Sequence, residues 1–343
     1  MAAGLVTFLV RRLINAIVTI ILMILIIFVL VHVVAPNPIA MARLYSPNPR
    51  ASTAVLEVIA RNQGFYNPLP VQFWDYVKNI FTGNFGTDLM TGNPEIMMIG
   101  QYLPISLQIV IIGNILGVLI GIFTGTVSAS NRNSKTDYGI KGVYLITWAA
   151  PTFIVASLLQ LVVAYWLGLL PSTGVVNSIL TAPKTVTGFP LIDSMLAGDW
   201  TYLVSVVQHM VLPCFAIAIV GFGLITRLTR ASMIDALDKD YVKLSYMKGQ
   251  SKRKVVYGTA FRNALIPVIT IVALTFGLSL AGAVVVEDIY NYHGIGFFTV
   301  QAVYSFDYVA LLALTVVFGI AIIVANLVAD LLYAVADPRV RLT

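Results

Sequence analysis

Residues 103–127 read LPISLQIVIIGNILGVLIGIFTGTV and contain no Asp, Glu, Lys or Arg. The hydrocarbon core of a bilayer is about 30 Å thick and is crossed by about 20 apolar residues in an α-helix. The stretch therefore predicts a membrane-spanning helix. Its glycines recur at every fourth position and share one face, where they allow a second helix to approach closely. We interpret Gly113, Gly117, Gly121 and Gly125 as helix-packing residues; the alternative is that they line a solute pathway.

The rest of the chain has the same apolar character. Of the 343 residues, 59% are apolar and 10% are charged, whereas about 25% of the residues in soluble domains are charged. We predict an all-α fold, a polytopic transmembrane helical bundle that forms a single domain over residues 1–343. Pro213 is expected to bend the short fourth run or to mark its start. The six predicted spans are 13–34, 103–127, 143–170, 210–225, 264–286 and 309–335.

The distribution of basic residues predicts the orientation. With the amino terminus inside, 16 of the 21 Lys and Arg residues fall on the inner side, including Arg339 and Arg341, and five fall on the outer side. The positive-inside rule therefore places both termini in the cytoplasm of a multi-pass protein of the cell membrane. The first run is too long for a signal-peptide core of about 7 to 15 residues. Because insertion explains the net charge of +6, no nucleic-acid partner is expected.

Several kinds of site are not expected in this chain. A single cysteine, Cys214, excludes a disulfide framework within the chain and a cysteine-based zinc cluster. Three scattered histidines predict no metal site, and no catalytic residue stands out. Asp330 is the only acid within a predicted span, which disfavours an ion-coupled secondary transporter. The chain also lacks a Walker A pattern for binding nucleotide phosphates.

The first outer segment, residues 35–102, is expected to be an extracytoplasmic loop with short helices. Ser52 can cap a helix over residues 53–60. Trp74, Val77 and Phe81 recur at helical spacing. This second helix either lies in the outer headgroup region or packs on the ends of the membrane helices.

The inner segment 231–262 contains the most informative motif. Residues 240–249 read DYVKLSYMKG and predict a short helix that stops at Gly249, before a second helix that Ser251 can cap. Tyr241, Leu244 and Lys248 fall on one side of the first helix, so apolar and basic groups are presented together. This composition suits docking to a soluble partner. The alternative is a loop that is basic only because it is cytoplasmic.

The inner segment resembles the cytoplasmic coupling loop, or EAA loop, of permease subunits of ATP-binding-cassette importers, in the form typical of the dipeptide and oligopeptide family. Lys243, Leu244 and Ser245 differ from the Glu-Ala-Ala of the general motif, and Thr259 stands where the family commonly has His. Further similarities to the B-type subunit follow in order along the chain, from VRRL at 10–13 and GNFG at 83–86 to EDIY at 287–290 and DPR at 337–339. The matching residues of the loop are Asp240, Tyr241, Val242, Lys248, Gly249, Ser251, Arg262, Asn263, Ala264, Leu265 and Pro267.

The resemblance implies the permease fold of a type I ABC importer and a set of partners. These are a C-type sister permease subunit that completes a heterodimer, two cytoplasmic ABC ATPases that bind ATP and Mg, and an extracytoplasmic solute-binding protein. The chain itself would hold no cofactor. Peptides are the implied solute, and oligosaccharides are the alternative; a carrier without ATPases and a membrane scaffold are less favoured. The implied ATPase-docking residues are Asp240, Tyr241, Val242, Lys243, Leu244, Ser245, Tyr246, Lys248 and Gly249.

Overall fold

The computed structural model describes residues 2–48 and 50–336, and within them the fold is helical without a β-strand, as predicted. Arg339, Arg341 and the DPR motif lie outside the described residues, and so does the side chain of Asp330. The helices are α1 (Ala2–Val34), α2 (Pro38–Leu44), α3 (Thr53–Asn62), α4 (Leu69–Phe81), α5 (Glu95–Ser130), α6 (Lys135–Ala149), α7 (Thr152–Leu159), α8 (Pro190–Ala197), α9 (Trp200–Leu237), α10 (Asp240–Met247), α11 (Lys252–Lys254), α12 (Phe261–Ile289), α13 (Ile295–Tyr304) and α14 (Tyr308–Ala336), with π-helical segments η1 (Gln160–Trp166) and η2 (Val255–Ala260).

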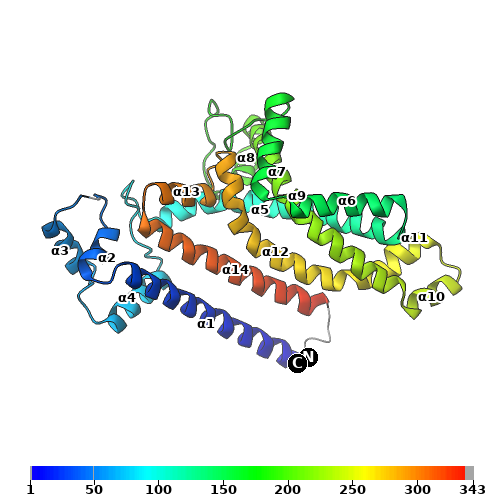
Figure 1. Ribbon diagram of the computed structural model, residues 1–343, viewed down its shortest axis with the longest axis horizontal. Helices are drawn as coiled ribbons and strands as arrows, with labels where there is room; N and C mark the ends of the chain where they lie inside the picture. The colour runs from blue at the N-terminus through cyan, green and yellow to red at the C-terminus, as the bar shows by residue number, and fades with distance from the viewer. Residues whose placement is uncertain (1, 49, 337–343) are drawn as a thin grey trace.

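Most of the long helices extend along the long axis of the molecule, and α7 and α8 project from its upper side (Figure 1). Helices α2, α3 and α4 lie at one end, whereas α10 and α11 lie at the other. The start of α1 and the end of α14 point toward the α10 end (Figure 1). The start of α1 and the end of α14 therefore point away from the short helices of the first long loop and toward α10.

Four helices in the described part of the chain are long and apolar enough to cross a membrane. They match the first, second, fourth and sixth predicted spans. Helix α12, with 29 residues, covers the fifth, although the side chains of several of its residues are not among those described. The four helices are Val10–Val34, Glu95–Ser130, Trp200–Leu237 and Tyr308–Val328.

The third predicted span is not the single straight helix that its hydropathy suggests. The chain bends by 105° between helix α6 and the α7–η1 segment, at Ala150 and Pro151. Proline lacks a backbone N–H and disfavours the helical conformation of the residue before it, and Ala150 is extended, with φ −77° and ψ 126°. The pair counts as a fifth crossing only if the two arms form one broken span; six crossings remain a prediction.

The fourth predicted span is much longer than the sequence suggested. Helix α9 has 38 residues, which at 1.5 Å per residue is about 57 Å, compared with about 30 Å for the bilayer core. Pro213 lies inside this helix and does not mark its start. Helix α9 therefore extends beyond the apolar layer. Its end leads directly into the predicted coupling segment.

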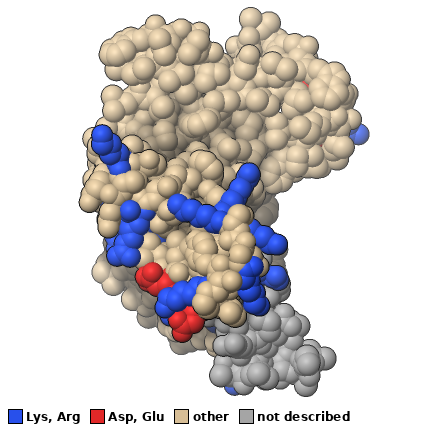
Figure 2. Space-filling model, turned by 90° about the vertical axis from the view of Figure 1, so that its right-hand side faces the viewer, with Lys and Arg blue, Asp and Glu red and all other residues tan. Residues whose placement is uncertain are grey.

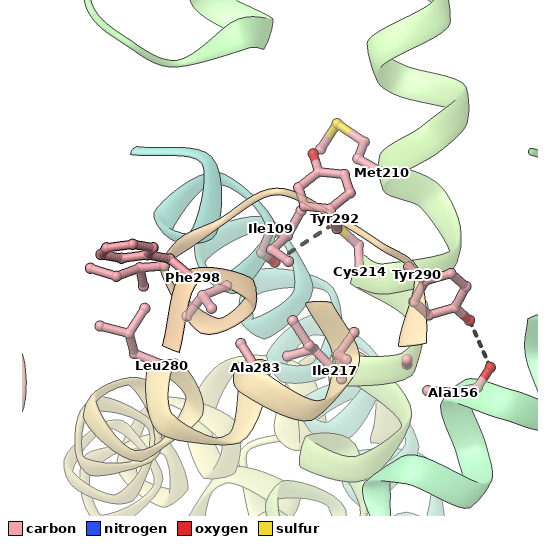
Figure 3. Close-up of a cluster of buried hydrophobic side chains, with 14 of the residues drawn as sticks. Ile109, Ala156, Met210, Cys214, Ile217, Leu280, Ala283, Tyr290, Tyr292 and Phe298 are labelled. Atoms are coloured by element: carbon pink, nitrogen blue, oxygen red, sulfur yellow. Dashed lines mark hydrogen bonds between the residues drawn. The ribbon is translucent and has the colours of Figure 1, made fainter. Parts of the chain in front are cut away.

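The main core lies where α5, α7, α9, α12 and α13 meet (Figure 3). Two buried polar atoms in it are satisfied by backbone carbonyl groups. The hydroxyl of Tyr290 donates to the oxygen of Ala156 at 2.8 Å, and the thiol of Cys214 donates to the oxygen of Ile109 at 3.6 Å. These bonds connect α7 to the end of α12 and α5 to α9, so the helices are fixed by directional contacts as well as by apolar packing.

Helix α4 packs on the end of α1 with one face only. Val77 and Ile80 are buried in a small cluster with Ile24 of α1, whereas Trp74 and Phe81 are 67% and 58% exposed. The structure thus supports packing on a membrane helix for one face of α4 and leaves the other face open. The neighbouring helix α3 begins at Thr53, but the Ser52 side chain makes no capping hydrogen bond, contrary to the sequence-based expectation.

Helices α5 and α9 approach each other along the four glycines of α5. A Cβ atom added at Gly113, Gly121 or Gly125 would lie less than 3.0 Å from an atom of α9, where real Cβ contacts are essentially absent, and one added at Gly117 would lie 3.0 Å away, closer than nearly all such contacts. The four glycines therefore form a seam that admits no side chain. The nearest residues of α9 to Gly113, Gly117, Gly121 and Gly125 are Ile217, Ala218, Ile225 and Thr226, in that order.

Because the seam leaves no room for a methyl group, Gly125→Ala should destabilise the protein. Its Cβ would lie 2.7 Å from the Thr226 backbone oxygen, and such overpacking costs about 1–3 kcal/mol. Thermal unfolding of the protein in detergent measures the effect. Gly142→Ala, in α6 with no atom within 4 Å of the added Cβ, is the matched control and should be neutral or stabilising. Equal stability of both variants would contradict the tight seam.

Candidate ATPase-docking site

Helix α10 is anchored to the bundle by one face. Val242 is fully buried and Ser245 is 9% exposed. Val242 packs in a cluster with Met233 and Ala236 of α9 and with the buried residues Val255 and Val256 of η2. Helix α10 therefore packs on the end of α9 and on η2, the segment that leads into α12. Its position depends on both contacts.

The opposite face of α10 is exposed and combines apolar with basic groups. Leu244 is 47% exposed and Met247 77% exposed. Tyr241 and Tyr246 flank them at 39% and 44%. An exposed apolar surface next to lysines, projecting from the end of the bundle, is suited to contact with another protein.

The structure divides the predicted docking residues into two groups. Val242 and Ser245 are buried and fix α10 in place, so they are not available to a partner in this arrangement. Met247, which the sequence analysis did not include, belongs to the exposed group. It could have been found from its position one helical turn after Leu244. The exposed members of the predicted set are Asp240, Tyr241, Lys243, Leu244, Tyr246, Lys248 and Gly249.

The surface around α10 is basic. Figure 2 looks onto this end of the molecule and shows Lys and Arg side chains around it, with few acids between them. Asp240 forms an ion pair with Lys243 at 2.9 Å, and the hydrogen bond from Lys243 lowers the pKa of the Asp240 carboxyl group. Both side chains are well exposed, so the pair contributes little to stability. Its effect is to orient Lys243 along the helix surface.

Helix α10 ends as the sequence predicts, at Gly249. The Gly249 N–H donates to the Tyr246 oxygen at 2.9 Å, and the Gln250 N–H donates to the Ser245 oxygen at 3.2 Å. Gly249 has φ +75°, a conformation that glycine adopts without the steric cost of a side chain. These two bonds form a Schellman motif, which reverses the chain and closes the helix. Ser251, by contrast, precedes α11 without a side-chain capping bond.

A buried ion pair fixes α9 to α6 near the same end. Arg230 donates to the Asp137 carboxylate from Nε at 2.8 Å and from Nη2 at 3.0 Å. The same carboxylate accepts a hydrogen bond from Ser128 and pairs with Lys141 at 2.8 Å. Ser134 caps α6 by accepting a hydrogen bond from the Asp137 N–H. Nothing in the sequence indicated Arg230, which is 93 residues away from Asp137.

Comparison with known proteins identifies the family. Residues 117–342 match the family described as the inner membrane component of binding-protein-dependent transport systems, and residues 5–101 match the N-terminal component of such membrane proteins. The chain belongs to this permease family. Its members are the membrane components of ABC importers, so the chain is a permease and not the ATPase of its system.

Among its relatives are three bacterial peptide permeases. The probable D,D-dipeptide transport system permease of Escherichia coli strain K12 is 33% identical over 314 residues, 91% of each chain. The dipeptide transport system permease of Alkalihalophilus pseudofirmus is 32% identical over 337 residues, which is 98% of this chain and 100% of the relative. The oligopeptide transport system permease of Bacillus subtilis is 33% identical over 296 residues, 86% and 87% of the two chains. The similarity extends over most of this permease.

A solved structure shares the fold of this permease. An inward-facing crystal structure of the MetNI methionine ABC transporter matches with a TM-score of 0.52 and covers 71% of this chain and 97% of the other. The sequences are 12% identical, so the match concerns the fold alone. The predicted permease fold of a type I ABC importer is confirmed.

The positive φ of Gly249 makes it the most sensitive position of this permease's coupling segment. We expect Gly249→Ala to weaken the end of α10 by about 1–2 kcal/mol, because an L-residue with a Cβ is strained in the left-handed region. Gly249→Asn, which tolerates this conformation better, is the matched control. Amide hydrogen exchange of Gln250, whose N–H closes the motif, measures the difference. If alanine leaves that exchange rate unchanged, the turn does not depend on glycine.

Proposed function

We propose that this permease is one of two membrane subunits of an ATP-driven importer and that α10 docks to a cytoplasmic ATPase. The observation that carries the proposal is the form of α10: its inner face is fixed in the bundle, while an apolar and basic face projects outward. The family membership supports the existence of a separate ATPase. In this proposal ATP and Mg are bound by two such ATPase subunits, and this chain holds neither.

The packing of α10 supports a route for coupling. Because Val242 contacts buried residues of both α9 and η2, a displacement of α10 moves two membrane helices together. Helix α9 is joined to α5 along the glycine seam, so the shift would reach the second predicted span as a rigid-body motion. The glycines act in helix packing in this proposal and not as the lining of the solute pathway.

The proposed topology has both termini and α10 in the cytoplasm and residues 35–102 outside. The start of α1 and the end of α14, which both point toward the α10 end, support it (Figure 1), as does the excess of basic residues on that side. Much of the apolar surface of the long helices is exposed, with only 11% of the apolar window of α1 buried. We propose that lipid and a C-type sister permease cover this surface, and that an extracytoplasmic binding protein delivers solute to the other end.

Peptides are the proposed solute. The names of the three relatives described above support this class. A cavity of about 640 Å³ between the 171–178 segment, α9 and the end of α12 has a hydrogen-bonding lining without Asp, Glu, Lys or Arg, which includes Ser205, Gln208, His209, Asn291 and His293. Such groups suit the backbone amides of a peptide, which carry hydrogen-bonding atoms without charge. Sugar hydroxyls have the same property, so oligosaccharides are the second candidate.

The solute class is tested on the complete transporter in proteoliposomes, with its binding protein supplied from outside. We expect short peptides to stimulate ATP hydrolysis and to accumulate inside, and oligosaccharides of similar size to do neither. The measurement is uptake of labelled solute together with phosphate release. Stimulation by oligosaccharides alone would replace the peptide assignment, and stimulation by neither would reject both solute classes.

The docking role is tested with Leu244→Glu. A carboxylate in the centre of the exposed apolar face should weaken binding of the ATPase at least tenfold, about 1.4 kcal/mol, because it must be buried in the interface without a partner. Val58→Glu, at a 57% exposed position of α3, is the matched control. Co-purification and surface plasmon resonance measure binding, and thermal unfolding shows whether the fold is kept. Unchanged ATPase binding of a folded Leu244→Glu protein would contradict the docking proposal.

A further inference from the structure

Three buried carboxylates meet at the end of the bundle opposite α10. Asp88 belongs to the loop before α5, Glu95 is the first residue of α5, and Asp307 directly precedes α14. Their exposed fractions are 4%, 0% and 1%. One oxygen of each lies within 4.8 Å of the corresponding oxygens of the other two. Three segments that are distant in sequence thus bring three acids to one point.

Two of the three acids have a local structural role. Asp88 Oδ1 accepts hydrogen bonds from the Met90 and Thr91 backbone N–H groups and from the Thr91 hydroxyl. Asp307 Oδ1 accepts from the Ala310 N–H at 2.9 Å and caps α14, while its Oδ2 accepts from the Leu89 N–H at 2.6 Å. These bonds explain why the two aspartates are ordered and buried. They do not explain why a third acid is placed beside them.

Glu95 has no such role. Both of its carboxylate oxygens are buried without a hydrogen-bond partner. Within residues 2–48 and 50–336, the ion pairs involve other acids, and no Lys, Arg or His pairs with any member of the cluster. A buried carboxylate without a partner is strongly unfavourable, and two neighbouring carboxylates increase the cost. The group that satisfies Glu95 must therefore bring positive charge into the cluster.

The donor atoms define the chemistry of that group. The cluster consists of carboxylate oxygens, which bind hard cations such as Ca²⁺ and Mg²⁺. Ca²⁺ lies about 2.4 Å from its oxygen ligands, so ligands on opposite sides of it are about 4.8 Å apart. Mg²⁺ needs shorter bonds of about 2.0–2.1 Å and keeps most of its water. The oxygens are close enough for either ion, but the full burial of the acids leaves little room for the water that Mg²⁺ retains and therefore favours Ca²⁺.

We propose that Asp88, Glu95 and Asp307 bind a Ca²⁺ ion. The ion would join the loop 86–94 to the first turn of α5 and to the start of α14, beside a cavity of about 210 Å³ that Asp88, Met98 and Phe298 help to line. In the proposed topology this end faces the outer solution, where sites of millimolar to submillimolar affinity are common in extracellular modules. The site is independent of α10 and of the transported solute.

The test uses the full permease purified with its partner subunits in nanodiscs of uncharged phosphatidylcholine, a lipid chosen to avoid Ca²⁺ binding by the bilayer. Isothermal titration with CaCl₂ after removal of divalent ions should show one site per permease chain with Kd of about 10⁻⁴ to 10⁻³ M. Ca²⁺ should also raise the unfolding temperature, and MgCl₂ should act more weakly. Glu95→Gln should weaken Ca²⁺ binding at least tenfold. Asp75→Asn, which removes an exposed acid of α4, should bind as the wild type does.

Two outcomes would overturn the proposal. If the wild-type complex neither binds Ca²⁺ nor gains thermal stability from it, protons neutralise the cluster, and Glu95→Gln should then be more stable than the wild type. If Glu95→Gln binds Ca²⁺ as well as Asp75→Asn does, the ion lies elsewhere.

Asp88→Asn keeps an oxygen for the local turn and serves as the second variant. It should lose Ca²⁺ binding as well, and retention of binding would reject Asp88 as a ligand.

Discussion

The close approach of α5 and α9 is the contact on which the rest of the structure depends. Both helices are longer than a bilayer core is thick, and they touch along four positions of α5 where no side chain fits. Within a membrane, apolar side chains gain little by leaving lipid, so helix association depends on close packing and on satisfied polar groups. The glycines allow the close packing, and hydrogen bonds such as that from the Cys214 thiol to the Ile109 oxygen satisfy the polar groups.

Helix α9 also connects the apolar part of the bundle to the α10 end. Along one continuous helix it carries the seam, the ion pair from Arg230 to Asp137, and the Met233 and Ala236 side chains that support α10. A helix held at several points over its length moves as a rigid element, because bending it would break these contacts together. This is the mechanical property that a coupling element needs, since a force applied at one end must reach the other without loss.

The sequence predicted the features that are encoded locally. Hydropathy located the long helices, the glycine spacing indicated the seam, and Gly249 marked the end of α10. Hydropathy could not indicate the bend at Pro151, because a broken helix and a straight one have the same composition. The contacts of Asp137 with Arg230 and of Glu95 with Asp307 were not predictable, because each joins segments far apart in the sequence. Only the packing of the helices brings such residues together.

The positions of the buried acids show how the described part of the fold accommodates negative charge. Among the described side chains, every buried acid lies in a loop, in a short helix or within the first or last turn of a longer one. Glu287, at the end of α12, accepts hydrogen bonds from the Gly296 and Phe297 N–H groups at the start of α13, where a helix end favours negative charge. Gly294 and Gly296 leave the space that this carboxylate occupies. The hydrogen bonds of Glu287 therefore stabilise the junction between α12 and α13. In the proposed importer the energy for transport comes from the ATPases, and the exposed face of α10 is the surface on which an ATPase would dock.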